Sequence, residues 1–306
     1  MTAPTQSPMP AAVDRRAQRQ FHERHADTAA CADPLSARTR EDLIERLELI
    51  TLEPSRVLDL GAGDGEAARV LARRYPKAQV VALDHAAGRC TRARRARGWR
   101  RRYQVVRGDL HALPFADGSV DLIFANLVLQ DCTSPDAALR ECRRVLRPGR
   151  GLLTFATLGP ATLTELREAW RAVDPACDAH VHDFVDMHDL GEALGRAGLC
   201  DPVLDVDRLQ LTYSSIDALG QELRRAGAAC ALAARRRSLT GAGRWRALRA
   251  HCAERLDDSA RLRITAELVF GHAWASPVPP PAGPSGVAPS GDTAVAIPLA
   301  NITRRS

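Results

Sequence analysis

Between residues 55 and 158, short apolar runs alternate regularly with segments of helical spacing. The runs fit buried strands, and the intervening segments of about 10 to 15 residues fit helices. Strands and helices that alternate in this way form right-handed crossovers and a parallel sheet. The expected strands lie within residues 56–63 and at 78–84, 103–109, 119–126 and 151–158. This pattern predicts a doubly wound α/β domain that binds its ligand at the carboxyl ends of the strands.

The segments outside this core predict further helices and one more pair of strands. Residues 38–50 have the apolar spacing of an amphipathic helix that leads into the core. Residues 161–199 look helical around a turn, and the strand-like runs 203–213 and 262–274 flank a helix near 216–229. The full expectation is a seven-stranded, mostly parallel sheet with N-terminal helices and a helical insertion over the active site.

Composition divides the chain into one main domain and two polar ends. We expect a disordered leader at 1–20, a domain at 21–275, and a Pro/Gly-rich linker and tail at 276–306. Within the domain, residues 55–158 form the ligand-binding core and residues 159–275 the substrate-side insertion and last strands. No apolar run approaches the roughly 20 residues that span a bilayer, so no membrane association is expected.

Cysteine usage and charge exclude several classes of protein. The eight cysteines include no C-x-x-C pair, which indicates a reducing, cytoplasmic compartment and no zinc knuckle. The net charge of +6 comes almost entirely from arginine, since Lys77 is the only lysine. We attribute this bias toward Arg and Ala to the codon composition of the gene, and we infer no nucleic-acid partner from it.

The glycine-rich turn in "VLDLGAGDGE" (57–66) narrows the choice of ligand. A dinucleotide turn needs glycine at the sixth position, where this chain has Glu66, and a P-loop needs a lysine that is absent. Asp59 precedes the turn and Asp64 lies within it. These carboxylates repel a pyrophosphate and suit a cationic ligand, such as the sulfonium and ammonium of S-adenosylmethionine.

Two further acids close the next strands. Asp84 follows Gly65 in the position from which a carboxylate accepts both ribose hydroxyls, and Asp109 can accept from an adenine amino group. The ordered motifs D-x-G-x-G-x-G, V-x-A-L-D and G-D-x-x-x-L-P-F resemble the class I S-adenosylmethionine-dependent methyltransferases, with their Rossmann-like fold, along about residues 55–160. The resemblance implies these cofactor-binding residues: Asp59, Gly61, Ala62, Gly63, Gly65, Asp84, His85, Asp109, Leu110 and Asn126.

The segment after the fourth strand argues against a nucleic-acid acceptor. It reads "NLVLQDCTSP" (126–135) and lacks the [DNS]-P-P-[YF] motif of base-amine methyltransferases. Cys132 lacks the neighbouring proline expected of a cytosine-methylating nucleophile, so we interpret it as a small buried residue.

Other segments give a narrower resemblance. "LREAWRAVD", "VDMHDLGEALGRAG", "LTYSSIDALGQELRRAGA" and "ELVFGHAW" are similar to the malonyl-[acyl-carrier protein] O-methyltransferases of biotin synthesis, over about residues 14–276. Such enzymes methylate the free carboxyl of a malonyl group on acyl-carrier protein. Mitochondrial complex I assembly factors share many of these segments. A methyltransferase with another small-molecule acceptor and a non-catalytic assembly factor therefore stay open as alternatives.

The chain departs from that family at three substrate-side positions. His22 stands where the family has tyrosine, Asp131 replaces the tryptophan of L-Q-W, and Asp183 replaces the arginine of H-x-x-R-F. Arg15, Arg16 or Arg19 can compensate for the lost positive charge. The substrate-side candidates are His22, Asn126, Gln130, Asp131 and Asp183.

A carboxylate acceptor is already ionised at pH 7, so no general base is required and no catalytic dyad is assigned. His180, His182 and His188 form an H-x-H pattern with no second cluster, so no metal is predicted. The arginine runs at 92–102 and 235–237 suit solvated faces or the approach of an acidic carrier protein.

Overall fold

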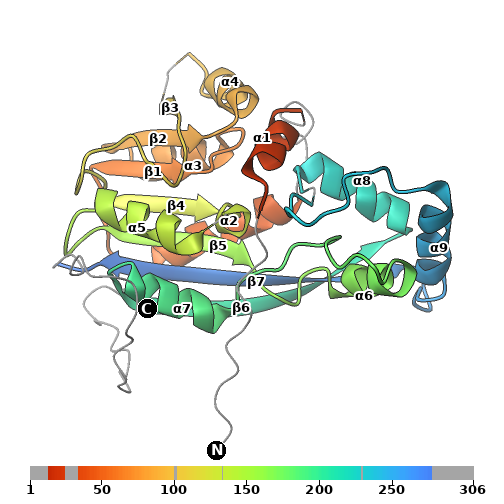
Figure 1. The fold of residues 1–306 in the computed structure, drawn as a ribbon. Coiled ribbons are helices and arrows are strands. Elements are labelled where there is room, and N and C mark those ends of the chain that lie inside the picture. Colours follow the sequence, from red (N-terminus) through yellow and green to blue (C-terminus); the bar gives the residue numbers. More distant parts are fainter. Residues whose placement is uncertain (1–12, 25–33, 100–101, 133, 229, 278–306) are drawn as a thin grey trace, which may run out of the picture.

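A computed structural model describes residues 13–24, 34–99, 102–132, 134–228 and 230–277 (Figure 1). Its seven strands form one sheet in the order β3-β2-β1-β4-β5-β7-β6. The strands are β1 (Arg56–Leu60), β2 (Gln79–Asp84), β3 (Gln104–Arg107), β4 (Leu122–Asn126), β5 (Leu152–Leu158), β6 (Leu199–Tyr213) and β7 (Leu262–Ala275).

The topology confirms the predicted doubly wound, mostly parallel sheet. β1 to β5 pair in parallel, and the order reverses between β1 and β4. Only β7 runs antiparallel, to β5 on one side and to β6 on the other. Ligand sites of such sheets lie outside the carboxyl ends of the strands at the reversal, beside β1 and β4.

Helices cover both faces of the sheet. They are α1 (Arg15–Arg24), α2 (Pro34–Glu48), α3 (Glu66–Arg74), α4 (Ala87–Ala96), α5 (Pro135–Val145), α6 (Thr164–Val173), α7 (Met187–Arg196), α8 (Ile216–Ala226) and α9 (Ala242–Ala253), with a short 3-10 helix η1 (Leu129–Asp131).

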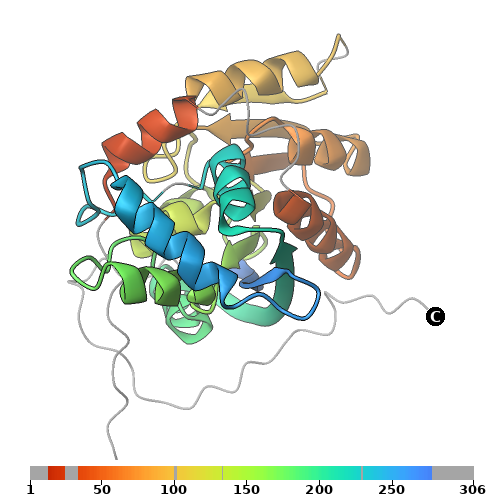
Figure 2. The same ribbon diagram turned by 90° about the vertical axis from the view of Figure 1, so that its right-hand side faces the viewer.

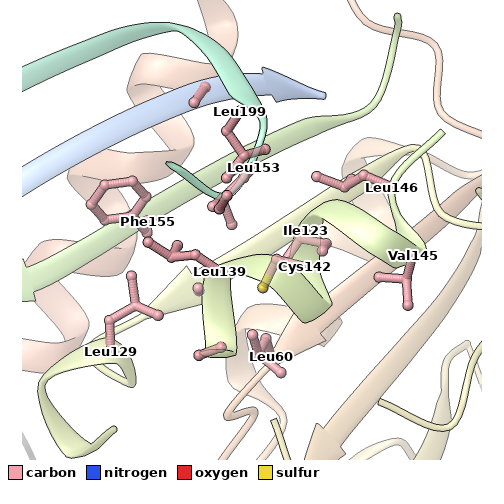
Figure 3. Packing of buried hydrophobic residues seen from close by; sticks show 14 of the residues in the cluster. Leu60, Ile123, Leu129, Leu139, Cys142, Val145, Leu146, Leu153, Phe155 and Leu199 are labelled. Carbon is pink, nitrogen blue, oxygen red and sulfur yellow. The ribbon is translucent and has the colours of Figure 1, made fainter. Parts of the chain in front are cut away.

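Successive strand residues alternate between two buried clusters, as the pleat of a strand requires. Ile123 packs with Leu139 and Cys142 of α5 on one face (Figure 3). Phe124, its neighbour in β4, packs with α2 and α3 on the other face. Apolar cover on both faces explains why the strands read as continuous apolar runs in the sequence.

β6 and β7 are much longer than the other strands and carry a third, smaller core at one end of the sheet (Figures 1 and 2). This core joins α6, α8 and α9 to the ends of both strands. Trp170, Leu219 and Leu248 are among its buried members. We call these three helices, together with residues 180–184, 227–228 and 230, the cover.

One expectation needs correction. Residues 15–20 belong to α1, so the predicted leader is shorter than 1–20. α1 is fixed because Asp14 donates its main-chain N–H to the Ala231 carbonyl (2.7 Å) and its Oδ1 accepts from the Ala17 N–H (3.0 Å). The leader residues 1–12 and the tail residues 278–306 lie outside the described residues. No described helix is long and apolar enough to cross a membrane.

The N-cap of α8 provides a small test of the cover. Ser215 Oγ accepts from the Ala218 N–H at 3.2 Å, which satisfies one otherwise free amide of the first turn. We expect Ser215→Ala to lower the free energy of unfolding by about 1 kcal/mol. Ser214→Ala, at the adjacent exposed serine, is the matched control and is expected to change it by less than about 0.5 kcal/mol in urea melts. Equal effects of the two changes would contradict the capping role.

Candidate functional site

A cavity of about 460 Å³ lies at the carboxyl ends of β1, β4 and β5. Its floor is the glycine turn after β1 and the segment after β4, and residues of α1, α2 and α4 form its sides. The cover closes it from above through apolar side chains such as Leu166, Leu219 and Leu223. Figure 2 looks onto this end of the molecule, where α1, α2, α6, α8 and α9 gather around the strand ends.

The glycine turn requires glycine for two different reasons. Gly61 has a φ of +72°, and a Cβ there would lie 2.6 Å from Cγ2 of Val128, so the turn packs directly on the segment after β4. Gly63 has a φ of +55°, but a Cβ would meet no atom within 4 Å. Gly63 also lines the cavity. At Gly63, the turn therefore presents main-chain atoms to a ligand without a side chain in between.

Asp59 is the acid buried beneath this turn. It is 1% exposed and lines the cavity, and its Oδ2 has no hydrogen-bond partner among the described residues. Burial, together with repulsion by Asp64 and Asp84, raises its pKa to about 7. A buried carboxylate with an unused acceptor attracts a cation and is stabilised by one.

Asp84 holds the turn from the end of β2. Its Oδ2 accepts from the Gly63 N–H (3.1 Å) and its Oδ1 accepts from the Ala86 N–H (2.8 Å). Arg89 Nη1 lies 3.9 Å from Oδ2. Each carboxylate oxygen has a second lone pair, so Asp84 keeps acceptor capacity for ligand hydroxyls.

The predicted cofactor residues divide into two groups. One group lines the cavity itself: Asp59, Gly61, Ala62, Gly63 and Asn126. The other group lies next to the turn or on the following strand end without lining the cavity: Gly65, Asp84, His85, Asp109 and Leu110. Asp109 is half exposed, and its Oδ1 lies 3.0 Å from His111 Nδ1.

Four of the five substrate-side candidates also line the cavity: His22, Asn126, Gln130 and Asp131. Asn126 donates to the Ser36 carbonyl at 2.9 Å, and its buried Oδ1 has no hydrogen-bond partner among the described residues. Gln130 is fixed by donating to the Leu127 carbonyl at 2.7 Å. His22 Nε2 lies 3.8 Å from Asp131 Oδ2.

Asp183 does not line this cavity. It is exposed and borders a separate hollow of about 30 Å³. Arg16 and Arg19 are exposed on α1 and also lie away from the cavity wall, and the Arg15 side chain lies outside the described part of the structure.

The positive charge at the cavity comes from other arginines, namely Arg40 of α2 and Arg89 and Arg92 of α4. The sequence contained a usable signal for the two on α4, since that helix directly follows the strand that ends in Asp84. Arginines near the amino end of such a helix lie beside the strand ends where ligands bind.

Asp174, Cys177 and His180 bring three possible metal ligands within 4.8 Å of one another. Asp174 already accepts two hydrogen bonds from Arg236 (3.1 and 2.9 Å), and Arg244 Nε lies 3.5 Å away. His180 lies 3.1 Å from the same carboxylate. Two guanidinium groups on the shared acid oppose a metal cation, so we interpret the group as an ion-pair network that fixes the cover.

A family model described as a methyltransferase domain matches residues 58–154. The malonyl-[acyl-carrier protein] O-methyltransferase of Laribacter hongkongensis is 43% identical over 270 residues, covering 86% of this chain and 90% of the relative. The same enzyme of Halorhodospira halophila is 43% identical, covering 86% and 88%.

Among solved structures, the YcgJ protein of Bacillus subtilis matches with a TM-score of 0.54 and 17% identity. The match covers 78% of this chain and 99% of that protein. At this identity the likeness concerns the fold alone, and it agrees with the sheet order described above.

Proposed function

Because the chain belongs to the malonyl-[acyl-carrier protein] O-methyltransferase family, we propose that it methylates the free carboxylate of a malonyl thioester on acyl-carrier protein, with S-adenosylmethionine as methyl donor. The reaction is an early step of biotin synthesis. The observation that carries the proposal is identity of about 40% over nearly the whole chain, cover included.

The residues around the glycine turn fit this donor. The unpartnered Oδ2 of Asp59 suits a positively charged ligand, and the open side of Gly63 leaves room for one. Asp84 would accept from the ribose hydroxyls, while Asp109 and Leu110 would border the adenine. A pyrophosphate does not fit, because Asp59 and Asp64 both repel it. When bound, S-adenosylmethionine supplies an electrophilic methyl group.

The acceptor needs positioning and not deprotonation. A malonyl carboxylate is ionised at pH 7, so an oxygen can attack without a general base. The Arg40, Arg89 and Arg92 side chains give the cavity the positive potential that attracts an anion. Asn126 and Gln130 orient the acceptor, and the apolar cover excludes water from the reacting atoms.

Transfer of label from methyl-tritiated S-adenosylmethionine tests the proposal. We expect the full chain to place an alkali-labile label on malonyl-acyl-carrier protein. Acetyl-acyl-carrier protein, which has the same carrier but no free carboxylate, is the matched control and should stay unlabelled. If the cofactor binds in calorimetry but malonyl-acyl-carrier protein is not labelled, label on a metabolite extract indicates another acceptor, and no label there indicates a protein that binds the cofactor without methylating. If the cofactor does not bind, the assignment of the methyl donor fails.

A further inference from the structure

Two arginine-rich segments that contain no acidic residue meet beside the cavity. They are residues 86–102 and 223–237, which include α4 and the end of α8. A Cβ built on Gly227, at the end of α8, would lie 2.9 Å from Arg89 Nη2 of α4. In both views of the fold, α8 lies below α4 (Figures 1 and 2). Two segments that are far apart in the sequence thus join into one basic surface.

The cavity reaches the outside of the molecule between these segments. Its wall there is formed by Arg89 and Arg92 of α4 and by Ala226, Gly227 and Ala228 at the end of α8. Ala228 is exposed, so this part of the cavity wall is also part of the outer surface. A group that is carried by a larger partner can therefore enter the cavity at this point.

Arg95 and Arg225 extend the basic surface outward from this entrance. Arg95 lies three residues after Arg92 on α4. Arg225 lies three residues after Glu222 on α8, so each arginine is the helical neighbour of a residue that lines the cavity. Both arginines are exposed, and among the described residues neither forms an ion pair or a side-chain hydrogen bond. Their guanidinium groups are available to the carboxylates of a partner.

The other arginine run of the sequence, residues 235–237, has a different use. Arg235 donates twice to Asp14 Oδ2, at 3.1 Å each. Arg236 donates to both carboxylate oxygens of Asp174, at 3.1 and 2.9 Å. These ion pairs fasten α1 and the cover, so the basic surface at α4 and α8 is the stronger candidate for contact with a partner.

Glu23 of α1 is an acid next to this surface, but its charge is compensated. Its two carboxylate oxygens accept from the Ala87 N–H (2.7 Å) and the Gly88 N–H (3.0 Å) at the start of α4. Arg107 Nη2 lies 3.5 Å from the same carboxylate. The surface around the entrance therefore keeps its positive sign.

We propose that Arg95 and Arg225, together with Arg92, form the docking surface for an acidic carrier protein at the entrance of the cavity. The inference rests on the proposed function for the identity of this partner. A cavity of about 460 Å³ holds an acyl group and not a protein, so the carrier must rest on the surface around the entrance. Opposite charges at the edge of an interface speed association and set its orientation, and salt weakens them.

The double variant Arg95→Glu/Arg225→Glu reverses two charges outside the cavity. At low salt we expect the KM for malonyl-acyl-carrier protein to rise about tenfold, with kcat within about twofold. The KM for malonyl-N-acetylcysteamine, a malonyl thioester without a carrier protein, should stay within about twofold, which also verifies that the variant is folded. An equal rise for both thioesters, or no rise for the carrier-bound one, would overturn the docking surface.

The matched control is Arg73→Glu/Arg140→Glu. These arginines are exposed on α3 and α5, do not line the cavity and form no ion pair among the described residues. The control changes the net charge by the same amount and should leave both KM values at the wild-type level. A rise like that of Arg95→Glu/Arg225→Glu would show an effect of net charge alone and would also overturn the proposal.

A binding measurement separates this inference from the proposed reaction. Fluorescently labelled acyl-carrier protein without an acyl group should bind the wild type in anisotropy, and bind Arg95→Glu/Arg225→Glu about tenfold more weakly. This result would support the docking surface even if no methyl transfer occurs, in which case the proposed function alone fails. Equal binding by the two proteins, no binding by the wild type, or tighter binding of a DNA duplex than of the carrier would overturn the docking surface.

Discussion

At pH 8, the Asp59→Asn variant is expected to be more stable than the wild type and yet to bind S-adenosylmethionine far more weakly. Asp59 is buried with an unpartnered oxygen, so its ionisation in the empty protein opposes folding. The same charge attracts the cationic donor. Removing it should raise the free energy of unfolding by about 3 kcal/mol and lower donor affinity by about 100-fold.

The direction of the expected stability change follows from the difference in the pKa of Asp59 between the folded and unfolded states. Burial raises the pKa of Asp59 from 3.8 to about 7, so the folded state holds its proton more tightly than the unfolded chain does. The contribution of this group to stability is present below pH 4 and is lost as pH rises toward 7. The advantage of Asp59→Asn in urea melts should therefore grow between pH 4 and 7 and level off above pH 7.

Asp205→Asn is a suitable control, because Asp205 is half exposed on β6 and pairs with Arg46 away from the cavity. It should alter neither the pH trend nor donor affinity. A variant at Asp59 that is equally destabilised at pH 5 and pH 8 would show that this carboxylate is not strained in the empty protein.

The second large effect is expected for Asp84→Ala. This change removes the acceptor of the Gly63 and Ala86 N–H groups as well as the proposed acceptor of the ribose hydroxyls. Charge-assisted hydrogen bonds contribute about 1.5–3 kcal/mol each, so donor affinity should fall by 100-fold or more in calorimetry. Asp84 is buried at the end of β2, so circular dichroism should be recorded in parallel to verify that the variant is folded.

Asp109→Ala offers the comparison. Its carboxylate is half exposed and bonds within its own turn to His111, so a loss of about tenfold or less is expected. Donor affinity of Asp84→Ala within threefold of the wild type would contradict the role assigned to Asp84, whatever the outcome at Asp109.

The central strands β1, β2, β4 and β5 could be predicted from the sequence because they are buried on both faces and end in recognisable turns. α9 could not be predicted. Its segment, "AGRWRALRAHCA", buries only Leu248 and Cys252, and its remaining residues give no apolar stripe. α1 was placed partly in a disordered leader because its stability comes from contacts with the distant loop around Ala231.

The same distinction applies to the residues of the candidate site: local sequence determines the position of some of them, and only tertiary packing determines that of others. Asp59 and the glycines were predictable because a strand and its turn determine their position locally. The contact between His22 and Asp131 was not, because α1 and the segment after β4 meet only in the folded chain, where Gln18 donates to the Asp131 main-chain oxygen. Asp183 was assigned to the substrate side by its place in a motif, but the loop turns its side chain outward into solvent.

The third core has a consequence for how such an enzyme changes over generations. The buried residues that fasten the cover, such as Trp170 and Leu248, belong to neither of the two clusters that flank the sheet. Mutations in the cover can thus reshape the roof of the cavity while the glycine turn and its acids keep their geometry. The residues of the cover and those of the glycine turn can therefore accumulate substitutions at different rates. A change in the cover can alter which acceptor is bound while the binding of the methyl donor is kept.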